Sequence, residues 1–107
     1  MQNELHIRRI IEERVYDTDT AALVHVLCKS GGHIALDFHA EYAALYRTRL
    51  GVFFIAGQSG ACGRWRRDEN GHRHPGNGIE VVSDTQARRL LEKANGPVES
   101  FFDVIDG

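Results

Sequence analysis

A short stretch between residues 64 and 74 gathers the arginine, histidine and tryptophan side chains of this chain that could do chemistry together. Guanidinium groups pair with carboxylates or phosphates in a fixed fork geometry, and an indole ring can stack on a base or fill a pocket of a protein partner. Asp68 and Glu69 interrupt the basic run. We therefore expect this stretch to contact a partner, with a protein favoured over a nucleic acid. The other interpretation is a solvated loop with Trp65 folded onto the core. The candidate partner-binding residues are Arg64, Trp65, Arg66, Arg67, His72, Arg73 and His74.

Cys62, His72 and His74 are the residues that a metal ion could use in this stretch. A structural zinc site takes four ligands at recognisable paired spacing, and no second Cys or His pair completes this set. Nucleophilic catalysis through Cys62 or Ser59 would require a nucleophile elbow or a cysteine-protease pattern, and neither is present. We expect no catalytic residue, no metal and no cofactor. A cryptic enzyme or metal protein that uses Cys62, His72 and His74 is the second alternative to our favoured function.

The glycines of residues 57–63 raise the question of a phosphate-binding loop. A P-loop needs Gly-Lys-Ser/Thr followed directly by a helix, and a dinucleotide fingerprint has a different glycine spacing within a βαβ unit. The favoured interpretation is a turn that lets the chain leave a sheet.

The composition indicates one folded domain over residues 1–107. The chain has 42% hydrophobic and 26% charged residues, and its formal net charge is −2. This charge disfavours a protein that binds nucleic acid by electrostatics alone. No apolar run approaches the roughly 20 residues of a membrane span, and no signal peptide is evident. We expect a cytoplasmic protein that does not bind membranes, with Cys28 and Cys62 reduced.

The first two predicted elements of the fold, a strand and a helix, meet at residues 17–20. Val15 and Tyr16 favour a strand over residues 10–16, and the short oxygen-bearing side chains that follow are typical of a helix N-terminus, with Asp17 or Thr18 as the N-cap. The spacing of apolar residues then predicts a helix over residues 19–29. Cys28 would lie in the core.

The middle of the chain shows strand patterns. Alternating apolar residues predict a strand over 34–38 with one wet face, and residues 42–47 and 52–56 predict an antiparallel hairpin closed by a turn with Gly51. Residues 61–78 then predict a flexible loop.

The last third reads as a strand, a helix and a tail. Residues 79–82 predict a short strand, and Ser83 with Gln86 predicts a capping box at the start of a helix that ends near Gly96. The C-terminal tail, residues 97–107, either docks on the sheet or binds a partner. The order of elements predicts an α+β fold in two layers, a largely antiparallel sheet of four to five strands with two helices on one face.

Four elements of the sequence, at residues 14–21, 45–48, 57–60 and 83–87, resemble motifs of a family of small phage- and plasmid-borne accessory proteins, over about residues 10–93 in all. Residues 14–21 match its Arg-x-Tyr-Asp-Thr-x-Thr-Ala junction, and residues 45–48 match its Leu-Tyr-Arg-Thr strand. The glycine-rich turn and the helix opened by Ser83, Gln86 and Ala87 also match. Residues 61–78 depart from the pattern because they are richer in Arg and His.

The resemblance implies a biological context rather than a particular chemical activity. Some accessory proteins of this size from mobile elements are anti-CRISPR inhibitors, so the leading hypothesis is a non-enzymatic, stoichiometric inhibitor of a host CRISPR effector complex in the bacterial cytoplasm. The first alternative is a small nucleic-acid-binding accessory or regulatory protein. The sequence leaves the effector type and the oligomeric state open.

Overall fold

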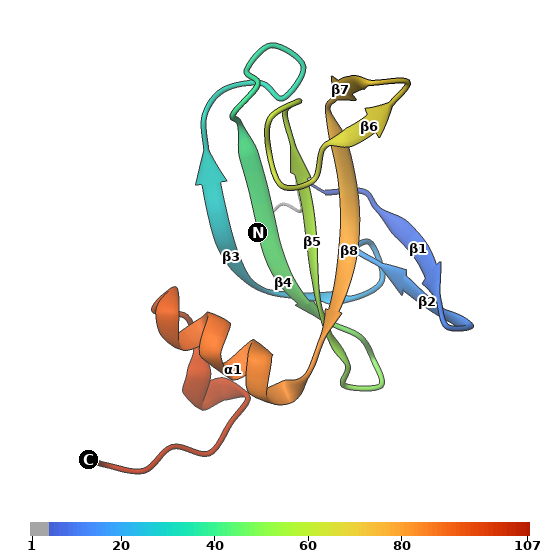
Figure 1. The fold of residues 1–107 in the computed structure, drawn as a ribbon. Coiled ribbons are helices and arrows are strands. Elements are labelled where there is room, and N and C mark those ends of the chain that lie inside the picture. Colours follow the sequence, from blue (N-terminus) through green and yellow to red (C-terminus); the bar gives the residue numbers. More distant parts are fainter. Residues whose placement is uncertain (1–4) are drawn as a thin grey trace.

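The computed structural model describes residues 5–107 and is built mainly of strands (Figure 1). A single α-helix and one short 3₁₀ helix follow the last strand. In chain order the elements are β1 (Arg8–Ile11), β2 (Arg14–Asp17), β3 (Ala22–Ser30), β4 (Glu41–Arg47), β5 (Phe53–Ser59), β6 (Arg67–Glu69), β7 (His72–His74), β8 (Gly76–Val82), α1 (Asp84–Lys93) and η1 (Val98–Ser100).

The central sheet has four antiparallel strands in the order β3-β4-β5-β8. Between β4 and β5 the register places Leu45 opposite Ile55, and the turn that joins them contains Gly51 at φ +88°. The predicted hairpin is therefore confirmed. The remaining strands form two small hairpins, β1–β2 and β6–β7.

Successive side chains of the central strands point to opposite faces of the sheet and form two hydrophobic clusters, one on each face. The N-terminal segment and the β1–β2 hairpin cover the first face, whereas α1, η1 and Trp65 cover the second. The first cluster contains Leu5, Ile7, Tyr16, Tyr42, Ala44, Tyr46, Phe54 and Ala56, and the second contains Ala43, Leu45, Phe53, Ile55, Val82, Ala87 and Leu91.

The predicted α+β fold with two helices on one face is wrong, because the segment expected as the first helix is strand β3. β-branched Val24 and Val26 favour a strand, and the apolar side chains of β3 pack on the two hydrophobic clusters. Val26 packs on the first cluster, whereas Leu27 and Cys28 pack on the second. Two register shifts in β3 change which face of the sheet the following side chains point to. The apolar residues of β3 therefore do not alternate strictly, and their spacing resembles the apolar stripe of a helix.

The strand predicted over residues 34–38 is also wrong, because this segment is a series of turns. The amides of Leu36 and Asp37 both donate to the carbonyl of His33, at 2.9 and 2.8 Å. Asp37 Oδ2 accepts from the amide of Gly32 at 2.9 Å, and its Oδ1 accepts from the amide of His39 at 3.0 Å. Side-chain bonds of this kind compete with strand pairing.

The strand predicted over residues 10–16 is divided into the β1–β2 hairpin. Glu12 and Glu13 form its two-residue turn, with φ of 49° and 68°. A turn of this kind usually carries Asn-Gly or Asp-Gly, so two glutamates give no sequence signal for it.

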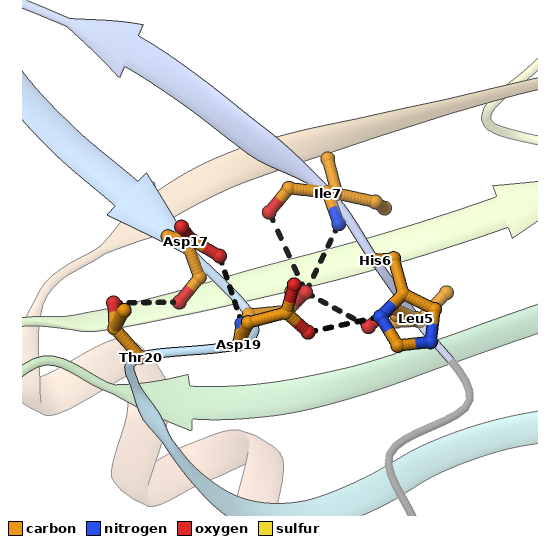
Figure 2. Close-up of polar contacts among 7 residues, drawn as sticks. Leu5, His6, Ile7, Asp17, Asp19 and Thr20 are labelled. Carbon is orange, nitrogen blue, oxygen red and sulfur yellow. Dashed lines mark hydrogen bonds and ion pairs between the residues drawn. The ribbon is translucent and has the colours of Figure 1, made fainter.

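The junction at residues 17–21 forms a turn rather than a helix cap (Figure 2). Asp17 Oδ1 accepts from the amide of Asp19 at 2.8 Å, and the Asp17 carbonyl accepts from the amide of Ala21 at 3.0 Å. Thr18 is buried, and its hydroxyl donates to the carbonyl of Leu5 at 2.9 Å while accepting from the amide of Ile7 at 3.0 Å. The oxygen-bearing side chains therefore tie the N-terminal segment to the sheet.

The predicted capping box of the last helix is confirmed. The amide of Gln86 donates to Ser83 Oγ, and the amide of Ser83 donates to Gln86 Oε1. Beyond α1, Phe101 and Phe102 pack their rings on Phe53, so the start of the tail docks on the second face of the sheet. No helix within residues 5–107 is both long and apolar enough to cross a membrane.

Candidate functional site

The segment predicted as a loop, residues 61–78, contains strands β6 and β7 and the start of β8. The β6–β7 hairpin projects beyond one end of the central sheet (Figure 1). The loop of residues 31–40 lies at the same end, where the amide of Cys62 donates to the carbonyl of Phe38 at 2.8 Å. We call this region, residues 31–40 and 60–76, the β6–β7 end.

Trp65 is half-buried and anchors the β6–β7 end to the sheet. Gly57 and Gly78 are cross-strand neighbours, and a Cβ on Gly57 would lie 2.1 Å from the Trp65 indole nitrogen. The indole therefore occupies space that only glycine leaves free. Arg64 lies over the ring, with its guanidinium carbon 4.6 Å from the centroid. Trp65 is therefore folded onto the core at the second face of the sheet.

Ser59 holds the turn that leads into Trp65. Its buried hydroxyl accepts from the amide of Trp65 at 2.9 Å and donates to the carbonyl of Gly60 at 3.2 Å. The amide of Gly60 in turn donates to the carbonyl of Ala40 at 2.9 Å. These bonds join the turn after β5 to the loop of residues 31–40, so the two segments form one support.

Three of the four arginines at this end pair with carboxylates of the same chain. Arg64 pairs with Glu80 on β8. Ion pairs also join Arg66 to Asp68 at 3.3 Å and Arg67 to Glu69 at 3.6 Å. The basic run of the sequence is therefore a surface of mixed charge in the fold. Within residues 5–107, Arg73 has no ion pair.

Leu36 and Phe38 are exposed apolar residues at the β6–β7 end that the sequence does not identify as a site. Their side chains are 85% and 60% exposed. The bonds that Asp37 accepts from the backbone fix the loop between them and also hold the pKa of its carboxyl below the ordinary value of 3.8. The alternation that predicts a buried strand face is the reason these residues were missed, and no signal in the sequence distinguishes the two interpretations.

Cys62, His72 and His74 do not form a metal site in the structure. No group of three or more His, Cys, Asp or Glu side chains within residues 5–107 is arranged to hold a metal ion. His72 and His74 lie on β7, whereas Cys62 lies in the turn after β5 and carries a free thiol. The structure thus separates a set that the sequence places close together.

A pocket of about 310 Å³ lies at the opposite end of the sheet, between the β2–β3 junction and the β4–β5 turn. We call this region the pocket end. Its apolar lining comes from both segments, and two arginines stand beside it. The lining residues used below are Arg14, Val15, Ala21, Arg49, Leu50 and Val52.

The pocket end unites the junction motif of residues 14–21 with the turn that follows residues 45–48. These two motifs are 24 residues or more apart in the chain, and the antiparallel path of β3 and β4 brings them together. Arg14 and Arg49 are exposed, and neither has an ion pair within residues 5–107. The chain shows no significant match to any family model, curated protein or solved structure.

Proposed function

We propose that this protein is a non-enzymatic binding protein whose β6–β7 end contacts a protein partner and blocks it stoichiometrically. The observation that supports the proposal most is the pair of exposed apolar side chains, Leu36 and Phe38, at the same end of the sheet as the β6–β7 hairpin. Aromatic residues and arginines dominate the energetics of protein interfaces, and paired charges around an apolar centre are typical of their rim.

The rigidity of the support favours the same function. Trp65 sits on Gly57 and Gly78, and Asp37 fixes the loop that carries Leu36 and Phe38. A surface that is ordered before it binds loses less conformational entropy on association. Trp65 thus has a supporting role in this proposal, and the contacts come from Leu36, Phe38, Arg73 and the edge of the β6–β7 hairpin.

The charge balance makes nucleic acid the weaker partner. Affinity for phosphates rises with the number of unpaired cations that release counterions. At the β6–β7 end, Arg64, Arg66 and Arg67 each already pair with a carboxylate. Such a surface suits a partner that offers both charges and apolar groups.

The target class comes from the resemblance of the sequence to accessory proteins of mobile elements. In this proposal the partner is a CRISPR effector complex, and inhibition takes place in the cytoplasm of the bacterial host. A protein contact of this kind needs no catalytic residue, because occupation of the effector surface is sufficient.

The test is co-elution of the purified protein with purified effector complexes in size-exclusion chromatography, combined with a phage interference assay in cells. The proposal expects a complex of fixed stoichiometry and loss of interference with at least one effector, and it expects Phe38→Ser to remove both. Absence of binding and of inhibition across the effector types would overturn the CRISPR target. A salt-sensitive gel shift with DNA or RNA, without effector binding, would instead support the nucleic-acid alternative.

A further inference from the structure

The pocket end combines an apolar floor with two arginines. Val15, Ala21, Leu50 and Val52 supply the apolar lining, and Leu50 is 84% exposed. Arg14 and Arg49 belong to the same lining, and no carboxylate of residues 5–107 forms an ion pair with them. Asp17 also lines the pocket, but its Oδ1 accepts from the amide of Asp19. The pocket therefore fits a segment that brings aliphatic side chains together with carboxylates.

The tail of this same chain carries such a segment. Val104 and Ile105 are 53% and 94% exposed, and they lie between Asp103 and Asp106. Two adjacent aliphatic side chains that are exposed on a tail offer an apolar contact to a partner. The order Asp-Val-Ile-Asp places two aliphatic side chains between two carboxylates, which complements the apolar floor and the two arginines.

The base of the tail is fixed on the domain, and its path leads away from the pocket of its own chain (Figure 1). Phe101 and Phe102 fix the start of the tail against Phe53 on the second face of the sheet. From there the chain runs away from the β4–β5 turn that lines the pocket (Figure 1). A tail that is anchored at its base and exposes Ile105 can reach the pocket of a neighbouring copy.

We infer that residues 103–106 of one copy dock into the pocket end of a second copy, with Asp103 and Asp106 paired to Arg14 and Arg49. A reciprocal exchange of two tails closes a symmetric dimer. The contact is small, so the dimer forms reversibly and depends on concentration. It uses neither Leu36 nor Phe38, and each dimer therefore presents two free β6–β7 ends.

Sedimentation velocity over a series of protein concentrations tests the inference through a charge exchange. One variant, Arg14→Asp/Arg49→Asp, makes the pocket acidic, and the other, Asp103→Arg/Asp106→Arg, makes the tail basic. In each variant the pocket and the tail then carry charges of the same sign. We expect each variant alone to dimerise at least about tenfold more weakly than the unchanged protein, because like charges face each other across the contact.

The equimolar mixture of the two variants is the decisive sample, since it pairs an acidic pocket with a basic tail and a basic pocket with an acidic tail. We expect the mixture to recover the dimer. Circular dichroism of each variant verifies that it is folded. An unchanged protein that stays monomeric at every concentration would overturn the inference, as would variants that dimerise normally or a mixture of folded variants that stays monomeric. These outcomes do not depend on the proposed inhibition, because no effector complex is present.

Discussion

The arginines at the two ends of the central sheet differ in whether they form ion pairs. At the β6–β7 end, a run of arginines in the sequence is largely neutralised by carboxylates from β6 and β8. At the pocket end, Arg14 and Arg49 come from separate segments and have no ion pair within residues 5–107. Clustering of basic residues along a chain is thus a poor measure of free positive charge, because the fold decides which carboxylates lie opposite.

The two ends also differ in how their apolar groups are presented. Leu36 and Phe38 stand out from a loop with side-chain and backbone bonds of its own, whereas Leu50 borders a pocket. A projecting apolar group suits insertion into a partner, and a pocket suits reception of one. This difference is the basis for proposing partner binding at the β6–β7 end and self-association at the pocket end.

The largest expected effect concerns the support of the β6–β7 end. Gly57→Ala places a methyl group 2.1 Å from the indole nitrogen of Trp65, so the ring must leave its site on the sheet. We expect the free energy of unfolding to fall by about 2–3 kcal/mol, which lowers the melting temperature by roughly 10–20 °C in a domain of this size. Thermal denaturation followed by circular dichroism measures this change.

Gly32→Ala is the matched control for this substitution. A Cβ on Gly32 would lie 3.8 Å from Asp37 Oδ2, which is an ordinary contact. We expect its stability to stay within about 1 kcal/mol of the original protein. Equal melting temperatures for the two alanine variants would show that Trp65 does not rest on Gly57.

The next effect separates the unpaired arginines of the two ends. Arg73→Ala removes the arginine of the β6–β7 hairpin that is free to pair with a carboxylate of a partner. We expect it to weaken binding of the effector complex by about tenfold, because a charged interface contact is lost. Titration calorimetry provides the affinity.

Arg49→Ala is the control, because it removes an arginine of the pocket end that has no ion pair within residues 5–107. The affinity of this variant for the effector complex should be unchanged. Equal losses of affinity in both variants would contradict the functional difference between the two ends.

A smaller effect is expected from acid. The amides of Gly32 and His39 lower the pKa of Asp37 below 3.8. A carboxyl whose folded pKa is depressed stabilises the fold fully above its unfolded pKa, and this contribution is lost as the pH falls through the folded value. The stability difference between the original protein and Asp37→Asn should thus shrink below pH 3.8.

Urea denaturation at a series of pH values from neutral to strongly acidic measures this difference. A difference that stays constant as the pH falls below 3.8 would contradict the role of the Asp37 carboxylate in the loop. Only the loop that presents Leu36 and Phe38 should respond, so effector binding should weaken in Asp37→Asn while dimerisation is retained.

Local sequence patterns predict the elements whose decisive contacts are near in the chain. The β4–β5 hairpin follows from two apolar segments around Gly51, and the capping box of α1 follows from Ser83 and Gln86. Both are closed by residues within a few positions of each other. Such elements can be predicted without knowledge of the rest of the fold.

The failures concern segments that distant partners decide. Residues 22–30 carry a spacing that fits a helical stripe, but pairing with β4 and two register shifts make them a strand. Residues 34–38 alternate like a strand but pair with no strand of residues 5–107, and Asp37 instead binds the backbone around it. Propensity is a weak guide where tertiary contacts override it in this way.

The sequence identifies residue types of the candidate site but does not predict their arrangement in the fold. The sequence identifies the arginines of residues 64–73, yet the pairing of Arg64 with Glu80 depends on the path of β8. The burial of Trp65 depends on glycines in β5 and β8 that face the same side. The strand predicted over residues 34–38 would place Leu36 and Phe38 together on one face, and only the fold reveals that both are exposed.

The most direct test of the account compares two leucines that match in type and exposure and lie at opposite ends of the sheet. Leu36 is 85% exposed at the β6–β7 end, and Leu50 is 84% exposed at the pocket end. Binding of the effector complex and dimerisation are measured for Leu36→Ser and Leu50→Ser. We predict that Leu36→Ser loses effector binding and keeps dimerisation, and that Leu50→Ser does the reverse. Retention of effector binding by Leu36→Ser, or its loss in Leu50→Ser, would contradict the assignment of partner binding to the β6–β7 end.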